Sequence, residues 1–147
     1  RSNKILFYTS LGKFMKGNKP LYNKNNKWLN YSTNVKPIYV RLNTTNQFAA
    51  INIEIQSRDK EIQTLFYDQF KEIKRAFESI LGNDWNWYQE ITNEDGINCS
   101  RISKELNNVN IYEKNSWPII FSFFKKNLLN FDQFWTEFNE LFKQLDD

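Results

Sequence analysis

Hydrophobic residues recur every three or four positions in three parts of the chain, which is the spacing of an amphipathic helix. The first pattern covers residues 2–16 and ends at Gly17, a common helix stop. The second follows Ser57, a suitable N-cap, and runs to residue 81. The third begins at Ser116 and continues to Leu145, which predicts either one long helix or a kinked pair.

Apolar and polar residues alternate in the remaining segments, as in half-buried strands. Residues 27–32, 37–43 and 47–56 predict an antiparallel meander, and residues 85–92 and 97–106 predict a second hairpin. A turn at residues 44–45 would set Val40 opposite Ala49. The element order α-βββ-α-ββ-α therefore predicts one α+β domain over residues 1–147, with a mostly antiparallel sheet and a long, aromatic-rich C-terminal helix.

The predicted meander has two unlike faces, because side chains alternate along a strand. One face is apolar and forms the expected core, with Leu29, Ile38, Val40, Leu42, Ala49, Ile51, Ile53 and Ile55. The other sets Trp28 beside Tyr39 and adds Arg41, Phe48, Asn52, Glu54 and Gln56. Two interpretations are open for this second face. Either the C-terminal helix covers part of it and Arg41 pairs with Glu54, or it is a recognition platform on which aromatic rings stack and Arg41 contacts phosphate or carboxylate.

Charge is divided unevenly along the chain, although the net charge is only +3. Residues 1–53 contain nine Lys or Arg and no Asp or Glu, whereas residues 54–147 contain eleven basic and seventeen acidic residues. This asymmetry fits a dipolar fold whose halves attract each other, or a basic face for an anionic partner. Five lysines surround a polar loop that includes Tyr22, an arrangement that could hold a nucleic-acid backbone: Lys13, Lys16, Lys19, Lys24 and Lys27.

Glu54 and Gln56 end the third predicted strand, where nucleases dependent on a divalent metal often carry a Glu-x-Lys or Glu-x-Gln pair. Such a site needs at least two acidic oxygen ligands for Mg²⁺. The 53 residues before Glu54 contain no carboxylate, and Gln56 stands where a lysine would polarise water. The chain also has no histidine and a single cysteine, Cys99, which removes the usual zinc sites and every mechanism built on a histidine base. We therefore expect no cofactor and no metal. These absences favour a non-enzymatic protein but leave an enzyme open.

One cysteine cannot form an internal disulfide, which favours a reducing cytoplasm as the setting of the protein. No run of apolar residues approaches the roughly 20 that a membrane span needs, and no signal peptide is visible. We expect a cytoplasmic protein without a membrane partner.

Several stretches together resemble a known family. They are "FYTSLGKFMK", "WLNYSTNVKPIYVRLN", "AAINIEIQSRDKEIQTLFYDQFKEIKRAFESILGNDWNW", "SRIS" and "NSWPIIFSFFKKNLLNFDQFW". This pattern is similar to the bacterial domain of unknown function 4268, in its stand-alone form. The family has no established catalytic residues to transfer. Its longer members carry a predicted nuclease-like domain ahead of this region, which implies an accessory role linked to DNA restriction or defence.

Three hypotheses follow for the function. The first is a non-catalytic binding or accessory domain that contacts nucleic acid through the Trp28/Tyr39/Arg41 face, with Glu54 and Gln56, and through phosphate contacts of Lys16, Lys19, Lys24 and Lys27. The second is a protein-interaction or homodimerisation module that uses the C-terminal helix. The third is an enzyme that uses Glu54 with Arg41, which requires a pocket at Glu54.

Overall fold

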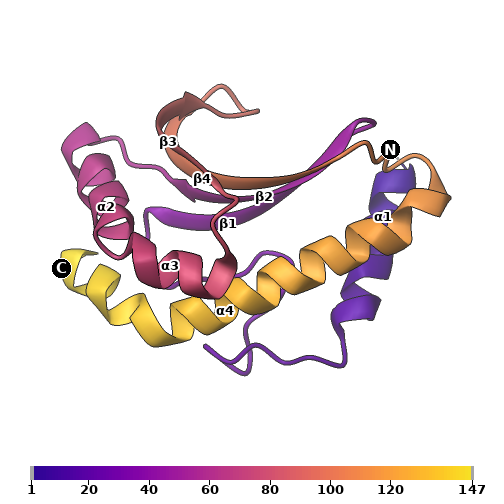
Figure 1. Ribbon diagram of the computed structural model, residues 1–147, viewed down its shortest axis with the longest axis horizontal. Helices are drawn as coiled ribbons and strands as arrows, with labels where there is room; N and C mark the ends of the chain where they lie inside the picture. Colours follow the sequence, from indigo (N-terminus) through magenta and orange to yellow (C-terminus); the bar gives the residue numbers. More distant parts are fainter. Residues whose placement is uncertain (1, 147) are drawn as a thin grey trace.

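The sheet and the long C-terminal helix form two layers in the computed structural model, which describes residues 2–146. Four antiparallel strands stand in the order β1-β2-β4-β3, and α4 runs beneath them (Figure 1). The helix α1 crosses α4 near one end, and α2 and α3 lie near its other end. The expected α+β class, the antiparallel sheet and the long C-terminal helix are confirmed. The elements are α1 (Ser2–Met15), β1 (Ile38–Thr44), β2 (Phe48–Ile55), α2 (Lys60–Glu72), α3 (Lys74–Leu81), β3 (Asn86–Thr92), β4 (Asn98–Asn107), the short 3₁₀ helix η1 (Lys114–Ser116) and α4 (Trp117–Asp146).

The turn between β1 and β2 lies at residues 46–47, two positions later than the sequence suggests. Thr45 positions it, because its hydroxyl oxygen accepts hydrogen bonds from the backbone amides two and three positions later, each at 3.0 Å. Val40 therefore pairs with Ile53 and not with Ala49, so the predicted register is wrong. The shift is four residues, an even number, and it leaves the same side chains on each face.

The segment 27–32, predicted as a strand, is a loop. Asn30 and Asn34 have φ angles of 70° and 60°, and these left-handed conformations interrupt an extended chain. Trp28 is buried in the core, and its indole Nε1 donates a hydrogen bond to the Asn18 carbonyl at 2.6 Å. The placement of Trp28 on the second face of the sheet is therefore wrong.

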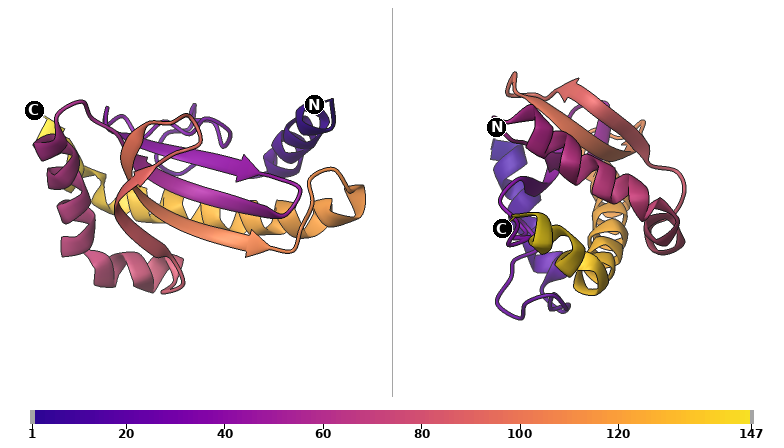
Figure 2. Two further views of the ribbon diagram at one scale, coloured as in Figure 1. Left: turned by 90° about the horizontal axis from the view of Figure 1, so that it is seen from above. Right: turned by 90° about the vertical axis from the view of Figure 1, so that its left-hand side faces the viewer.

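The helix predicted between Ser57 and Leu81 consists of two helices, α2 and α3, which meet at Ile73. Ile73 departs from helical geometry, with φ −109° and ψ 29°. The N-cap of α2 is Asp59 and not Ser57, because the Asp59 carboxylate accepts a hydrogen bond from the Glu61 amide at 2.9 Å. The break sets α2 and α3 at an angle around the end of the molecule where the chain terminates (Figure 2).

The helix α4 is continuous over 30 residues and carries apolar side chains on more than one stripe. The helix α1 packs against one part of α4, and α2 and α3 pack against another. Phe14 of α1 packs against Phe121 with ring centroids 5.3 Å apart, and Phe77 of α3 packs against Phe134 at 5.3 Å. Within the described chain, Ile119 is the one large hydrophobic side chain of α4 that is substantially exposed, at 54%. The aromatic helix is thus a core element with a layer on each side.

The β3–β4 hairpin curls over the sheet face that points away from α4 (Figures 1 and 2). The register of the two strands shifts between Tyr88 and Ile91, and a bulge of this kind increases local twist. The Asn93 side chain at the hairpin tip donates to the Glu54 carboxylate at 3.3 Å. The hairpin, and not the C-terminal helix, covers the second face at Glu54.

Candidate functional site

The Glu54 carboxylate lies at the centre of a charged cluster and is only 1% exposed. Arg101 is its direct cross-strand partner on β4 and donates to Oε2 from Nε at 3.1 Å and from Nη2 at 2.5 Å. Oε1 accepts from Gln56 at 3.1 Å and from Asn93 at 3.3 Å, and it lies 3.4 Å from the Arg41 Nε. Both carboxylate oxygens are thus fully engaged by donors of the protein.

Arg101 also binds Glu94 at the hairpin tip, with Nη2 and Oε1 2.8 Å apart. Partial burial disfavours the charged form of each group, but the hydrogen bonds outweigh it. They raise the pKa of Arg101 through Glu94 and Glu54, and they lower the pKa of Glu94 through Arg101. Arg101 and Glu94 are therefore both charged at neutral pH, and their contact fastens the hairpin to the sheet.

Arg41 differs from Arg101 because its side chain is 45% exposed. Its Cζ lies 4.6 Å from the centroid of the Tyr39 ring, a cation–π contact. The expected ion pair with Glu54 is confirmed and uses Nε. Stacking and pairing together hold the guanidinium plane, and no residue of the described chain takes a hydrogen bond from its Nη atoms. Arginine in this arrangement suits a phosphate or carboxylate group.

A cleft of about 360 Å³ follows the outer edge of β1 beside this cluster. Residues 40–43 of β1 line it, together with Asn52 and Glu54 of β2. Tyr8 of α1 and Leu29 of the preceding loop line one side, and Glu94 and Asp95 of the hairpin tip line the other. The pocket that the enzyme hypothesis requires at Glu54 is present, but the Glu54 carboxylate is saturated with hydrogen bonds and has no free oxygen to act as a base.

Four of the five residues predicted for the binding face come together, and Trp28 does not. Tyr39, Arg41, Glu54 and Gln56 share the second face, whereas Trp28 stacks on Tyr31 in the core, with ring centroids 6.3 Å apart. Sequence reasoning missed three residues that complete the cluster on this face: Asn93, Glu94 and Arg101. They become neighbours of Glu54 only because β4 pairs with β2, which no local pattern reveals.

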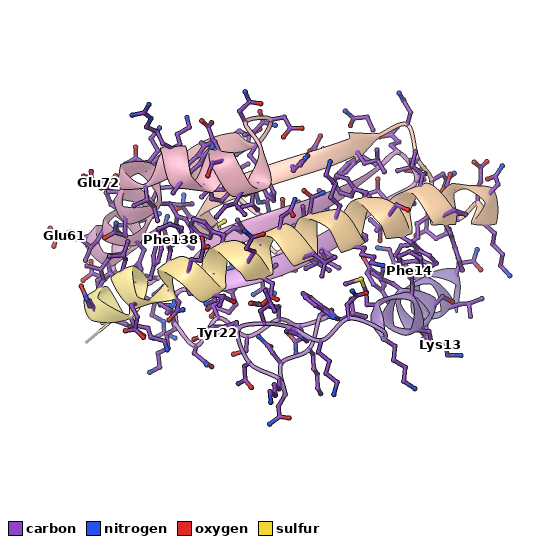
Figure 3. All side chains as sticks on the ribbon, turned by 60° about the horizontal axis from the view of Figure 1, so that its bottom comes forward. Lys13, Phe14, Tyr22, Glu61, Glu72 and Phe138 are labelled. Carbon is purple, nitrogen blue, oxygen red and sulfur yellow. The ribbon has the colours of Figure 1, made fainter. Side chains whose placement is uncertain are left out.

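The outermost part of the loop of residues 16–37 lies on the side of α4 that faces away from the sheet (Figure 1). Figure 3 shows this side of the molecule, with Lys13, Phe14 and Tyr22 labelled. Two lysines of α4 lie near this region: the Lys125 Nζ is 5.3 Å from the Phe14 ring of α1, and the Lys143 Nζ is 5.4 Å from the Tyr22 ring of the loop. We call the following set the lysine surface: Lys13, Lys16, Lys19, Lys24, Lys27, Lys125 and Lys143. The five N-terminal members lie at least partly exposed, and none pairs with a carboxylate of the described residues.

Asp132 of α4 holds this loop in place through three hydrogen bonds. Its carboxylate is buried and accepts from the backbone amides of Leu21 at 2.6 Å and Tyr22 at 3.2 Å. The Tyr31 hydroxyl donates to the same carboxylate at 2.6 Å. Burial, followed by this hydrogen bond and the Asp132 charge, raises the pKa of Tyr31. The loop that carries the lysines is therefore held in one conformation although it has no regular structure.

The family model described as Domain of unknown function (DUF4268) matches residues 4–139, nearly the whole chain. The chain belongs to this family. No curated protein matches it, and no solved structure matches it.

Reactive groups are scarce in this DUF4268 domain. No three Asp, Glu or Cys side chains within residues 2–146 are grouped so that they could hold a metal ion. Cys99 of β4 is buried, and burial, reinforced by the Glu54 charge, raises the pKa of its thiol to about 11. Across the same range of residues, no helix has the length and apolar character that crossing a membrane requires. Arg41 beside Tyr39, and the lysine surface, are the features of the described residues on which a functional proposal can be built.

Proposed function

We propose that the protein is a non-catalytic binding domain whose partner is nucleic acid, contacted through the lysine surface. The observation that carries this proposal is that the five N-terminal members of the lysine surface are exposed, lie in or next to one loop, and pair with no carboxylate of the described chain. Lysine is a compact point charge that binds phosphate without a fixed hydrogen-bond geometry. Several such charges on one face neutralise successive phosphates of a strand and release its counterions.

The fixed loop supports the same proposal. Asp132 holds the backbone at Leu21 and Tyr22, so binding does not have to order the loop first. The half-buried Tyr22 ring lies among the lysines and offers an aromatic edge for a base. Arg41 and Tyr39, on the second face of the sheet, provide a separate anion contact, because the Arg41 Nη donors are free among the described residues.

The second hypothesis, dimerisation through the aromatic C-terminal helix, has less support. Its stripes are covered by α1 on one side and by α2 and α3 on the other. We therefore retain the binding domain as the proposal. We also propose that it acts in the bacterial cytoplasm, in an accessory role to DNA restriction. The single protonated thiol and the resemblance to longer proteins with a nuclease-like domain support that setting.

Charge reversal with a matched control tests the proposal. The test variant changes Lys16, Lys19, Lys24 and Lys27 to Glu. The control makes the same change in net charge at four exposed cations elsewhere: Arg58, Lys71, Arg75 and Lys114. Fluorescence anisotropy with a labelled oligonucleotide of about 20 bases measures affinity between about 50 and 200 mM salt, the range in which phosphate contacts show their salt dependence.

We expect the wild type to bind with an affinity that falls steeply with salt. The test variant should bind at least about 100-fold more weakly, with a slope of log K against log salt reduced by about 0.7 for each lost contact to single-stranded DNA. The control should lose no more than a few-fold. Binding that is absent at low salt, or equal losses in the two variants, would refute a specific lysine surface.

A further inference from the structure

The outer edge of β1 has backbone groups that no strand pairs. β1 is the terminal strand in the order β1-β2-β4-β3. The Gln56 amide donates to the Pro37 carbonyl at 2.8 Å, which shows that the odd-numbered positions of β1 bond inward to β2. Alternation then directs the N–H and C=O groups of Val40 and Leu42 outward. No backbone hydrogen bond joins either residue to a segment beyond the sheet in the described chain.

The free stretch is short because both of its ends are occupied. At one end, the Ile38 amide donates to the Val35 carbonyl at 3.0 Å, and the Thr33 hydroxyl donates to the Ile38 carbonyl at 2.8 Å. At the other end, Thr44 is only 1% exposed, and a hydrogen bond of 2.8 Å between its hydroxyl and that of Tyr8 sets α1 against the strand and limits access to it. A partner strand could therefore pair with β1 only between Ile38 and Thr44.

The cleft of about 360 Å³ follows this same free stretch. Its volume lies within the usual range of ligand-binding clefts. The two sides of the cleft differ in character. Leu29 and Tyr8 border it on the side of the sheet that packs on the core, and Arg41, Glu94 and Asp95 border it on the second face. On that face the charges of Arg41 and Arg101 are offset by Glu54 and Glu94, which leaves the Asp95 carboxylate in excess. Asp95 is exposed and forms no ion pair with a described residue.

We propose that this edge binds an extended peptide segment of a partner protein, which adds a short antiparallel or parallel strand to β1. Main-chain hydrogen bonds to Val40 and Leu42 would hold the segment, as in other cases of strand addition. Side chains of an extended peptide alternate between the two faces. Apolar side chains fit the Leu29 side, and basic side chains fit the side of Glu94 and Asp95. The ligand class is thus a segment of alternating apolar and basic residues.

Capped pentapeptides provide the probe. One alternates valine and lysine, and a second replaces both lysines by glutamate. Amide hydrogen exchange followed by NMR on the full chain reports where each probe binds. We expect the valine–lysine peptide to slow exchange at Val40 and Leu42 by at least tenfold. Exchange at Arg41 and Asn43 should change little, because their amides already bond to β2.

Two further comparisons separate strand addition from general attraction. N-methylation of one alternate set of peptide amides should abolish binding, and methylation of the other set should preserve it, because only one set faces β1. The Asp95→Asn variant should weaken the lysine probe several-fold, while Asp68→Asn, an exposed acid on α2, should not.

Four results would overturn the proposal. The first two are no binding at a probe concentration of about 1 mM, the upper end of weak binding, and equal binding of the glutamate peptide. The other two are protection of the Val40 and Leu42 amides without peptide, by pairing of two copies of this chain, and protection of the same amides by an oligonucleotide. The proposal does not rest on nucleic-acid binding. The variant with Lys16, Lys19, Lys24 and Lys27 reversed should bind the peptide normally, so failure of one proposal leaves the other standing.

Discussion

Arg101 holds Glu54 across β4 and β2 with two hydrogen bonds, 3.1 Å from Nε and 2.5 Å from Nη2, and both side chains are almost completely buried. A buried ion pair adds little stability relative to an apolar pair of the same size, but loss of one partner leaves an uncompensated charge. The pair also connects the hairpin tip to the sheet, since Arg101 binds Glu94 at the same time. Its main effect is to specify where β4 and the hairpin lie.

Replacement of Arg101 by methionine should lower the free energy of unfolding by about 3–5 kcal/mol, because the buried Glu54 carboxylate loses its most closely bound cationic partner. The double variant Glu54→Leu/Arg101→Met should recover most of this loss. The half-exposed Arg41 serves as control, and Arg41→Met should cost less than about 1 kcal/mol. Urea denaturation measures all three. A double variant no more stable than Arg101→Met would contradict the assignment of the cost to an unpaired charge.

The Asp132→Ala variant should release the loop of residues 16–37. Two backbone amides and the Tyr31 hydroxyl would lose their acceptor, at a cost of about 1–3 kcal/mol in the free energy of unfolding. Amide exchange at Leu21 and Tyr22 should accelerate more than elsewhere in the chain. Glu137→Ala, an exposed site on the same helix, is the control.

The Asp132→Ala variant also separates loop order from lysine charge. If the fixed loop contributes to the lysine surface, nucleic-acid affinity should fall although no lysine has changed. Unaltered exchange at Leu21 and Tyr22 would show that the loop is held by other contacts, such as the Trp135 Nε1 bond to the Thr33 carbonyl at 2.9 Å.

Local patterns predicted the elements whose signal is carried by nearby residues. The helices α1 and α4, the β3–β4 hairpin and the apolar face of β1 and β2 follow from periodicity alone. The same approach failed at residues 27–32, because two asparagines adopt positive φ within or just after an otherwise alternating stretch. It also failed at Ile73, where the hydrophobic period continues through a break that neither glycine nor proline marks.

Contacts between segments that are far apart in the chain could not be predicted from the sequence. The pairing of Glu54 with Arg41 was predicted from their place on one face of a single hairpin. The predicted register set Arg41 opposite Phe48, whereas the observed register sets it opposite Asn52 and so brings it next to Glu54. Arg101 was not predicted, since its contact with Glu54 depends on the insertion of β4 between β2 and β3. Asp132 likewise meets Leu21 over a sequence separation of 111 residues. Such contacts form when complete helices and strands pack together. The hydrophobic spacing within each element does not show which elements will become neighbours.

The stability conferred by Cys99 should be lost in alkaline solution. Burial raises the pKa of its thiol from an ordinary value of 9.0 to about 11 in the folded protein. The native state therefore favours the protonated thiol, and this contribution is complete below pH 9.0 and disappears as the pH rises through about 11. Between these values the wild type should lose about 2–3 kcal/mol of unfolding free energy relative to Cys99→Ala.

Urea denaturation of both proteins at several pH values measures this difference. Tyr8, Tyr31 and Tyr67 also have raised pKa values, but they titrate in both proteins and cancel in the comparison. A stability difference that does not change with pH would show that the thiolate forms without penalty. Slow alkylation of the thiol by iodoacetamide in native protein, with fast alkylation in urea, provides an independent measure of its burial.

Gly82 ends α3 with φ 99° and ψ 165°, a conformation that is almost restricted to glycine. A Cβ atom at this position would lie 3.0 Å from the Asp84 carboxylate oxygen Oδ1. Gly82→Ala should therefore lower the free energy of unfolding by about 1–3 kcal/mol.

Gly17 is the matched control, because its φ is not positive and a Cβ atom added there would have no neighbour within 4 Å. Gly17→Ala should be neutral or stabilise by up to about 1 kcal/mol, since alanine restricts the unfolded chain. Thermal and urea denaturation of the two variants measure the contrast, and equal effects would show that the turn after α3 can adopt another backbone conformation at little cost.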